Sequence, residues 1–324
     1  MRFIFWRFLR FFSAFCVTCL NSQREITPHM VHSAPQNAWL RAMPIVFVLI
    51  WSTGFIVARY GMPYAPPLKF LATRYALSLL CFAAWIVLAR VKAPSSRAQW
   101  LHLAVVGVLV HAGYLGGVWS AVKLGMGSGL SALIVGLQPV LTALWMSYIG
   151  GKVTARQWGG LVLGFIGLLL VVSTKLGHGE ATTLNLSFAA MALLSITAGT
   201  LYQKRFVSPC DVRSANAVQL GAALLVTLPL TLLEPEAMQW NAQLAWAMAW
   251  SVVGLTLGGS SLLYLLVQRG AATTVTSLLY LVPPTTAFMA WILFNEAITT
   301  VTVVGTVLTA LGVWLVVRSA SLKR

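Results

Sequence analysis

Long uncharged runs dominate the sequence from residue 42 onward. Most are long enough to cross a bilayer as a helix, because about 20 apolar residues span the ~30 Å hydrocarbon layer. The runs are continuously apolar rather than alternating, which argues against a membrane barrel, and backbone polar groups in lipid must then pair within a helix. This pattern predicts an all-α integral membrane protein with ten transmembrane helices. The runs are 42–58, 75–89, 98–122, 124–151, 157–174, 181–203, 214–233, 237–268, 270–295 and 297–317.

Composition supports a membrane location. Hydrophobic residues make up 59% of the 324 positions and charged residues only 9%, whereas soluble domains carry about 25% charged residues. The net charge of +16 would suit a nucleic-acid partner if the basic residues clustered, but here they separate apolar runs, so no nucleic-acid partner is expected. The four cysteines have no spacing of a disulfide framework or zinc site. No metal and no cofactor are expected.

The distribution of Lys and Arg predicts the orientation. If the N-terminus is cytoplasmic and the ten helices alternate, most basic residues fall in cytoplasmic segments, as the positive-inside rule requires. Both termini are therefore expected in the cytoplasm, in a multi-pass protein of the cell inner membrane. The opposite side then carries four glutamates, namely Glu180, Glu234, Glu236 and Glu296.

The two halves of the chain resemble each other. Arg59 aligns with Lys204, 145 positions later, and the same shift aligns the hydrophobic runs and several glycines, with Pro139 on Pro284. This indicates a five-helix unit used twice. Because five is odd, the second unit must be inverted, and inverted repeats are typical of transporters that open a central site alternately to each side. The expected organisation is a cytoplasmic N-terminal extension 1–42, a first repeat 43–175, a second repeat 183–318 and a cytoplasmic tail 319–324. The extension is either a basic aromatic helix on the membrane surface or a segment without fixed structure.

Several motifs resemble those of one transporter family. They are Trp51-Ser-Thr-Gly-Phe-Ile-Val-Ala-Arg59, Gly127-x-Gly-x-Ser-Ala-Leu-x-x-Gly-Leu-Gln-Pro139 with its echo before Pro284, and Phe294-Asn-Glu296. Over residues 43–318 the chain is similar to the drug/metabolite transporter superfamily, in the group with two EamA domains. The resemblance implies an alternating-access exporter of small metabolites such as amino acids or related compounds, as a monomer or homodimer. Where the family usually has a second acidic residue, this chain has Gly150-Gly151-Lys152.

Paired prolines mark candidate breaks in the fourth and ninth predicted helices. Pro139 in the first half and Pro283 and Pro284 in the second remove backbone donors and free nearby carbonyls. Breaks at matching positions in two repeats indicate a substrate site near the membrane midplane, with Gln138 and Tyr280 as polar contacts. The alternative is that the prolines only shape helix packing.

Polar and aromatic residues inside the predicted helices are further candidates for the cavity. His111 is either a neutral hydrogen-bond donor or a proton carrier. Arg74 either extends toward the membrane surface or attracts an anionic group. Glu296, together with His111, is the candidate for energy coupling, which is expected to be weak through His111 or replaced by passive or exchange transport. The cavity candidates are Trp51, Arg74, His111, Tyr114, Gln138, Pro139, Tyr202, Ser260, Tyr264, Tyr280, Pro283 and Pro284.

An enzyme, a lipid carrier and a channel are the alternatives to a transporter of soluble metabolites. The loop carboxylates are too few and too scattered for metal-dependent or acid–base catalysis, so no enzyme is expected. A carrier or flippase of a lipid-linked substrate is the main alternative, because the resemblance is to a fold whose members include carriers of lipid-linked sugars. Arg74 could contribute to the basic pocket that such a substrate needs, but one residue does not decide it. A channel fits less well, since broken helices in an inverted repeat suit alternating access.

Overall fold

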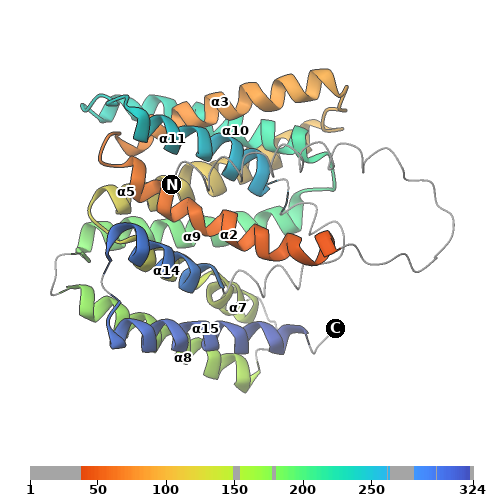
Figure 1. Ribbon diagram of the computed structural model, residues 1–324. Helices are drawn as coiled ribbons and strands as arrows, with labels where there is room; N and C mark the ends of the chain where they lie inside the picture. The colour runs from red at the N-terminus through yellow and green to blue at the C-terminus, as the bar shows by residue number, and fades with distance from the viewer. Residues whose placement is uncertain are drawn as a thin grey trace. The chain divides into compact units, whose positions relative to one another are not determined.

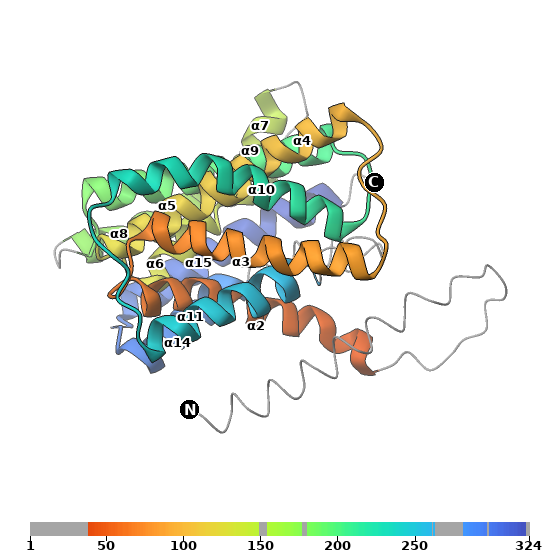
Figure 2. The same ribbon diagram turned by 90° about the horizontal axis from the view of Figure 1, so that it is seen from above.

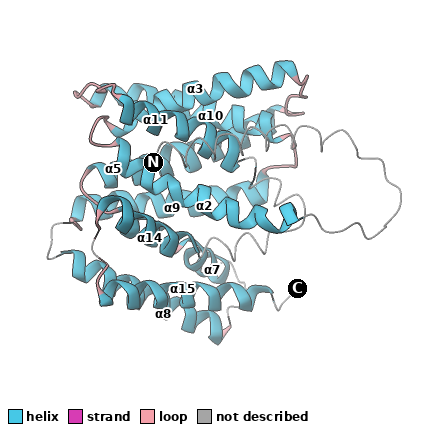
Figure 3. Ribbon diagram, viewed as in Figure 1, coloured by secondary structure: helices cyan, strands magenta, loops and turns pink. Residues whose placement is uncertain are grey.

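Helices and their connecting loops make up the part of the chain that the computed structural model describes, which is residues 38–148, 154–176, 180–260, 262, 281–296 and 298–321 (Figure 3). No strand occurs within these ranges. Each of the ten uncharged runs contains helix, so the prediction of an all-α protein is confirmed. Tyr264 and Tyr280 lie outside the described residues, as does most of the predicted N-terminal extension 1–42.

The helices of the first half are α2 (Ala38–Gly61), α3 (Pro67–Leu88), α4 (Arg97–Gly107), η1 (Val108–Leu115), α5 (Gly116–Lys123), α6 (Ser128–Val135), α7 (Gln138–Tyr148) and α8 (Ala155–Leu176). Those of the second half are α9 (Thr183–Phe206), α10 (Val212–Leu230), η2 (Thr231–Leu233), α11 (Ala242–Trp250), η3 (Ser251–Gly259), α14 (Val282–Phe294) and α15 (Thr300–Ser321).

Five helical segments of the described chain are long and apolar enough to cross a membrane. Their outer faces carry bare apolar side chains, for example Val87 and Leu225, which are 75% and 76% exposed. Such surfaces suit lipid rather than water. The number of ten crossings stays a prediction. The five segments are Pro67–Leu88, Arg97–Lys123, Ala155–Thr174, Thr183–Phe206 and Val212–Leu233, and shorter apolar helices are Ile45–Gly61, Ser128–Thr142, Val282–Phe294 and Thr300–Leu315.

The two halves pack as a symmetric pair. Helix α3 contacts α10 and α8 contacts α15, and the partners in each of these pairs are equivalent under the 145-residue shift, while α6 contacts α14, whose equivalent is α7. Helices α8 and α15 run side by side in Figure 1, and α3 lies along α10 in Figure 2.

Glycines bring α8 and α15 into backbone contact. A Cβ on Gly167 would lie 2.5 Å from the carbonyl oxygen of Gly305, and a Cβ on Gly312 would lie 2.5 Å from that of Gly160. The two contacts are equivalent by the internal symmetry. After a shift of 145 residues, Gly312 corresponds to Gly167 and Gly305 corresponds to Gly160. Small residues allow this approach where lipid provides no hydrophobic drive for association.

Replacing Gly312 with Val is therefore expected to destabilise the protein. The added side chain meets backbone, which cannot rotate away, and overpacking of this kind costs about 1–3 kcal/mol. We expect a lower melting temperature and less monodisperse protein in detergent. The matched control is Gly159→Val on the same helix pair, where no atom lies within 4 Å of the added Cβ. Equal melting temperatures for the two variants would contradict close packing at Gly312.

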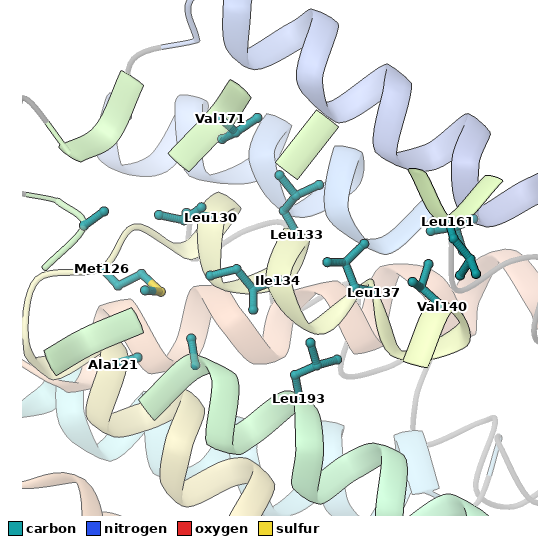
Figure 4. Packing of buried hydrophobic residues seen from close by; sticks show 13 residues of the cluster. Ala121, Met126, Leu130, Leu133, Ile134, Leu137, Val140, Leu161, Val171 and Leu193 are labelled. Atoms are coloured by element: carbon teal, nitrogen blue, oxygen red, sulfur yellow. The ribbon is translucent and has the colours of Figure 1, made fainter. Parts of the chain in front are cut away.

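A buried apolar cluster surrounds α6 (Figure 4). Leu130, Leu133 and Ile134 of this helix pack between Val171 of α8 and Leu193 of α9. The helix ends at Gly136, and α7 starts two residues later at Gln138. The cluster thus holds a broken helix in the interior, which is where the sequence predicts a break.

Candidate substrate cavity

Two π-helical segments occupy equivalent positions in the two halves. Segment η1 covers Val108–Leu115 and η3 covers Ser251–Gly259, which corresponds to residues 106–114 after the 145-residue shift. Each continues an α-helix, α4 and α11 respectively. π-Helical turns are rare and often accompany functional sites. Neither segment was predicted from the sequence, although η3 has three glycines and both segments contain two valines.

A cavity lies between these segments. The cavity is partly open to its surroundings. Most of its wall is apolar or aromatic, with a few polar groups, which is the usual make-up of a small-molecule site. The lining residues are Trp51, Gly54, Phe55, Arg74, Val110, His111, Tyr114, Leu115, Val118, Trp119, Leu255, Thr256 and Ser260.

Five of the residues predicted to line a cavity meet here. Trp51 comes from α2, Arg74 from α3, His111 and Tyr114 from η1, and Ser260 from the residue after η3. The cavity therefore combines elements of both halves. Thr256, which the sequence analysis did not single out, completes its polar side.

The remaining described candidates lie elsewhere. The Gln138 amide donates to the Thr200 hydroxyl at 3.0 Å, and the Tyr202 hydroxyl pairs with Nδ1 of His102 at 2.9 Å. Neither Gln138 nor Tyr202 is among the residues that line the cavity. Polar side chains in an apolar helix can thus be satisfied by a neighbouring helix without contacting the cavity.

The prolines stand at helix starts rather than at mid-helix kinks. Pro139 is the second residue of α7, and Pro283 and Pro284 lie in the first turn of α14. A missing backbone donor costs little there, because the first turn has no acceptor for it. The Cγ atom of Pro283 lies 2.9 Å from where a Cβ on Gly136 would stand, so Pro283 packs against the break between α6 and α7.

Arg74 is buried in the cavity wall with 6% of its surface exposed. Its Nε and one terminal nitrogen both donate to the Thr256 hydroxyl at 3.1 Å, and that hydroxyl donates to the Ser251 carbonyl at 2.9 Å. The side chain therefore points across to the second half and does not reach the membrane surface.

His111 belongs to the first half, as Arg74 does, and it makes the symmetry-related contact with the second half. Its ring pairs with the side chain of Gln219 on α10, and its carbonyl accepts a hydrogen bond from the Tyr75 hydroxyl at 2.8 Å. Shifting by 145 residues turns Arg74 into Gln219 and His111 into Thr256. The pairs Arg74–Thr256 and Gln219–His111 are thus related by the internal symmetry, with charge on one side only.

Three glutamates of the second half bind the first half at one end of the helices, which we call the glutamate end. Glu234 accepts hydrogen bonds from the backbone nitrogens of Leu68 and Lys69, both at 2.9 Å. These nitrogens belong to the first turn of α3, whose backbone N–H groups have no acceptor within the helix. A carboxylate there is also favoured by the helix dipole.

The other two glutamates add further contacts between the halves. Glu236 pairs with Lys123 at 2.8 Å, and the hydrogen bond from this ammonium holds the pKa of the Glu236 carboxyl below its usual value. Glu296, the predicted coupling residue, caps α6 by accepting from the backbone nitrogens of Ser128 at 2.9 Å and Gly129 at 3.4 Å.

The opposite end of the helices is held by neutral hydrogen bonds between the halves and by the guanidinium of Arg213, which lies 5.6 Å from the centre of the Trp85 ring. The Gln99 amide donates to the Ser208 carbonyl at 3.0 Å, and the Ser214 hydroxyl donates to the Lys92 carbonyl at 2.8 Å. The acid here, Asp211, pairs with Arg213 two residues away. Burial raises the pKa of the Asp211 carboxyl, but hydrogen bonds from the Arg213 side chain and backbone outweigh this effect and leave it below its usual value.

Comparison with known proteins identifies the class. The model of the EamA-like transporter family matches the chain twice, over residues 38–173 and 183–318. The chain belongs to this family, and the resemblance that the motifs indicated is confirmed. It is accordingly a multi-pass membrane protein of a transporter family with small-molecule substrates.

Two relatives are described as "probable amino-acid metabolite efflux pump". The protein from Salmonella typhimurium is 24% identical over 191 residues, covering 59% of this chain and 62% of its own length, which is less than two thirds. The protein from Escherichia coli K12 is 22% identical over 240 residues, covering 74% of this chain and 71% of its own. A protein of known crystal structure shares the fold, with a TM-score of 0.62 and 17% identity over 86% of this chain and 97% of that one.

Proposed function

We propose that the chain is an alternating-access exporter of the cell inner membrane that carries small metabolites such as amino acids or related compounds. The observation that carries this proposal is the cavity between the two π-helical segments, because each half of the chain supplies part of its wall. A site built at the contact of two similar units can be opened to either side when the units rock.

The contacts at the two ends support a gated mechanism. The Lys and Arg distribution predicts that the glutamate end is outside and both termini are in the cytoplasm. In this orientation the outer side is closed by charge-assisted contacts from Glu234, Glu236 and Glu296. The inner side is closed by neutral hydrogen bonds and by the contact of Arg213 with the Trp85 ring. Charge-assisted bonds are stronger than neutral ones, so the described conformation favours a closed outer side.

Energy coupling in this proposal is either weak, through His111, or absent, with passive or exchange transport. Glu296 is bound to two backbone nitrogens of α6 and does not line the cavity. His111 lines it, and pairs with the neutral side chain of Gln219.

Counterflow in proteoliposomes tests the proposal. Vesicles are loaded with a mixed pool of amino acids, sugars, nucleosides and polyamines, and exchange is followed by mass spectrometry. We expect selective exchange of one class, strongly reduced in Trp51→Ala, which shortens a cavity-lining side chain. The matched control is Tyr202→Phe, which removes a hydroxyl away from the cavity and should leave exchange nearly unchanged.

Either of two results would contradict the proposal. Equal losses in Trp51→Ala and Tyr202→Phe would show that exchange does not depend on this cavity. Absence of exchange for every soluble solute, with movement of fluorescent lipid between leaflets, would replace the proposal with a lipid carrier.

A further inference from the structure

Among the described residues that line the cavity, Arg74 alone has a permanent charge. A guanidinium has five N–H donors. Two nitrogens of the Arg74 guanidinium donate hydrogen bonds, and both bonds go to the hydroxyl oxygen of Thr256. The side chain is more than nine-tenths buried and borders the cavity, so donor capacity is left over on its cavity side.

The described carboxylates are all placed away from Arg74. Glu234, Glu236 and Glu296 bind the first half at the glutamate end, and Asp211 pairs with Arg213 at the opposite end. The fifth, Glu180, lies beside Gly127 at the glutamate end, 3.2 Å from where a Cβ on that glycine would stand. A buried cation without an anionic partner is costly in a membrane interior, and such residues normally face a partner or a substrate path.

The rest of the cavity wall indicates the body of the ligand. Trp51, Phe55, Tyr114 and Trp119 present aromatic surface, and the polar groups beside them, Ser260 among them, are uncharged apart from Arg74. A planar guanidinium matches a carboxylate in a two-bond geometry. The wall therefore suits one anionic group attached to an apolar body.

Internal symmetry limits the ligand to one such group. The position equivalent to Arg74 is Gln219, which is 8% exposed and pairs with His111 as Arg74 pairs with Thr256. Gln219 is neutral and is not among the residues that line the cavity. Among the described residues, the wall therefore offers a ligand one permanent cation, that of Arg74.

We propose that the cavity binds an organic monoanion, with its carboxylate on Arg74 and its apolar body against Trp51 and Tyr114. This inference rests on the proposed function, since it names the substrate class of the same cavity. It excludes cations such as polyamines, which Arg74 repels.

Binding to purified protein in nanodiscs tests this without requiring transport. The probes are N-acetylphenylalanine and its amide, which differ only in charge, and binding is read from quenching of tryptophan fluorescence. We expect the wild-type protein to bind the anion at least about tenfold more tightly than the amide. Equal binding of the two probes by the wild-type protein would overturn the proposal, and this comparison needs no variant.

Substitutions then locate the charge that is responsible. Arg74→Gln is expected to abolish the preference for the anion, and Arg74→Lys is expected to keep part of it. A preference that persists in folded Arg74→Gln would overturn the assignment. If Arg74→Gln does not fold, Arg74→Lys decides: a reduced preference for the anion supports the assignment, and a preference equal to that of the wild-type protein contradicts it.

A phospholipid arm distinguishes the source of the anion. Soluble dihexanoyl phosphatidic acid carries a phosphate instead of a carboxylate, and tighter Arg74-dependent binding of this lipid than of N-acetylphenylalanine would overturn the carboxylate assignment. Failure of this inference can also be distinguished from failure of the proposed function. Anion preference with no counterflow would refute transport alone, and counterflow without anion preference would refute this inference alone.

Discussion

Cross-linking position 123 to position 236 is expected to stop transport almost completely. The Lys123–Glu236 pair joins the two halves at the glutamate end, and a covalent bridge there prevents the separation that opening requires. The experiment uses Lys123→Cys with Glu236→Cys in a chain whose native cysteines are Ser, joined by a reversible bifunctional methanethiosulfonate. Counterflow should fall to background and recover when a reductant releases the bridge.

A matched bridge at the other end provides the control. Asp211 and Arg213 also form an ion pair, at 2.7 Å, but both belong to the second half. Cross-linking Asp211→Cys to Arg213→Cys joins residues that do not move apart when the halves rock, so counterflow should be retained. Full activity of the bridged 123–236 protein would show that the glutamate end does not open during transport.

Filling the cavity from Gly54 is expected to give the second large effect. A Cβ at Gly54 meets only the side chain of Leu255, at 3.7 Å, so a larger residue there extends into the cavity without striking backbone. The larger side chain takes up space that the substrate needs, and a loss of ~1.4 kcal/mol in binding is a tenfold change, so Gly54→Leu should reduce exchange roughly tenfold or more while the protein still folds.

Two glycines serve as comparisons for Gly54→Leu. Gly221 on α10 has no atom within 4 Å of its added Cβ, so Gly221→Leu should leave exchange close to the wild-type rate. Gly199, the symmetry equivalent of Gly54, has Val110 at 2.6 Å, so Gly199→Leu should lower the melting temperature. Unchanged exchange in Gly54→Leu would place the substrate path outside the cavity.

The helical fold was predictable because the membrane imposes it. Continuous apolar runs leave no alternative to helices, and the 145-residue shift revealed the two halves before any contact between them was known. Residues such as Arg74 and His111 were also conspicuous, since ionisable groups inside apolar helices are costly and stand out. The structure places both of them at one cavity.

What escaped prediction depends on contacts between the halves. Thr256 and Gln219 are uncharged and ordinary in an apolar helix, so nothing in their own segments marks them. The symmetry shift itself was the available signal, because it aligns them with His111 and Arg74. Gln138, by contrast, looked suitable beside its proline, but its amide is satisfied by Thr200 on α9.

The capping of α6 by Glu296 has a consequence for biosynthesis. The first turn of this helix obtains its carboxylate from a residue that is synthesised 168 positions later, and the first turn of α3 similarly depends on Glu234, 166 positions after Leu68. While the ribosome is still producing the second half, these inserted helices therefore lack the partners for their exposed backbone nitrogens. The N-terminal half consequently reaches its final geometry only after the C-terminal hairpin has been inserted, which makes completion of the chain a condition for folding of its beginning.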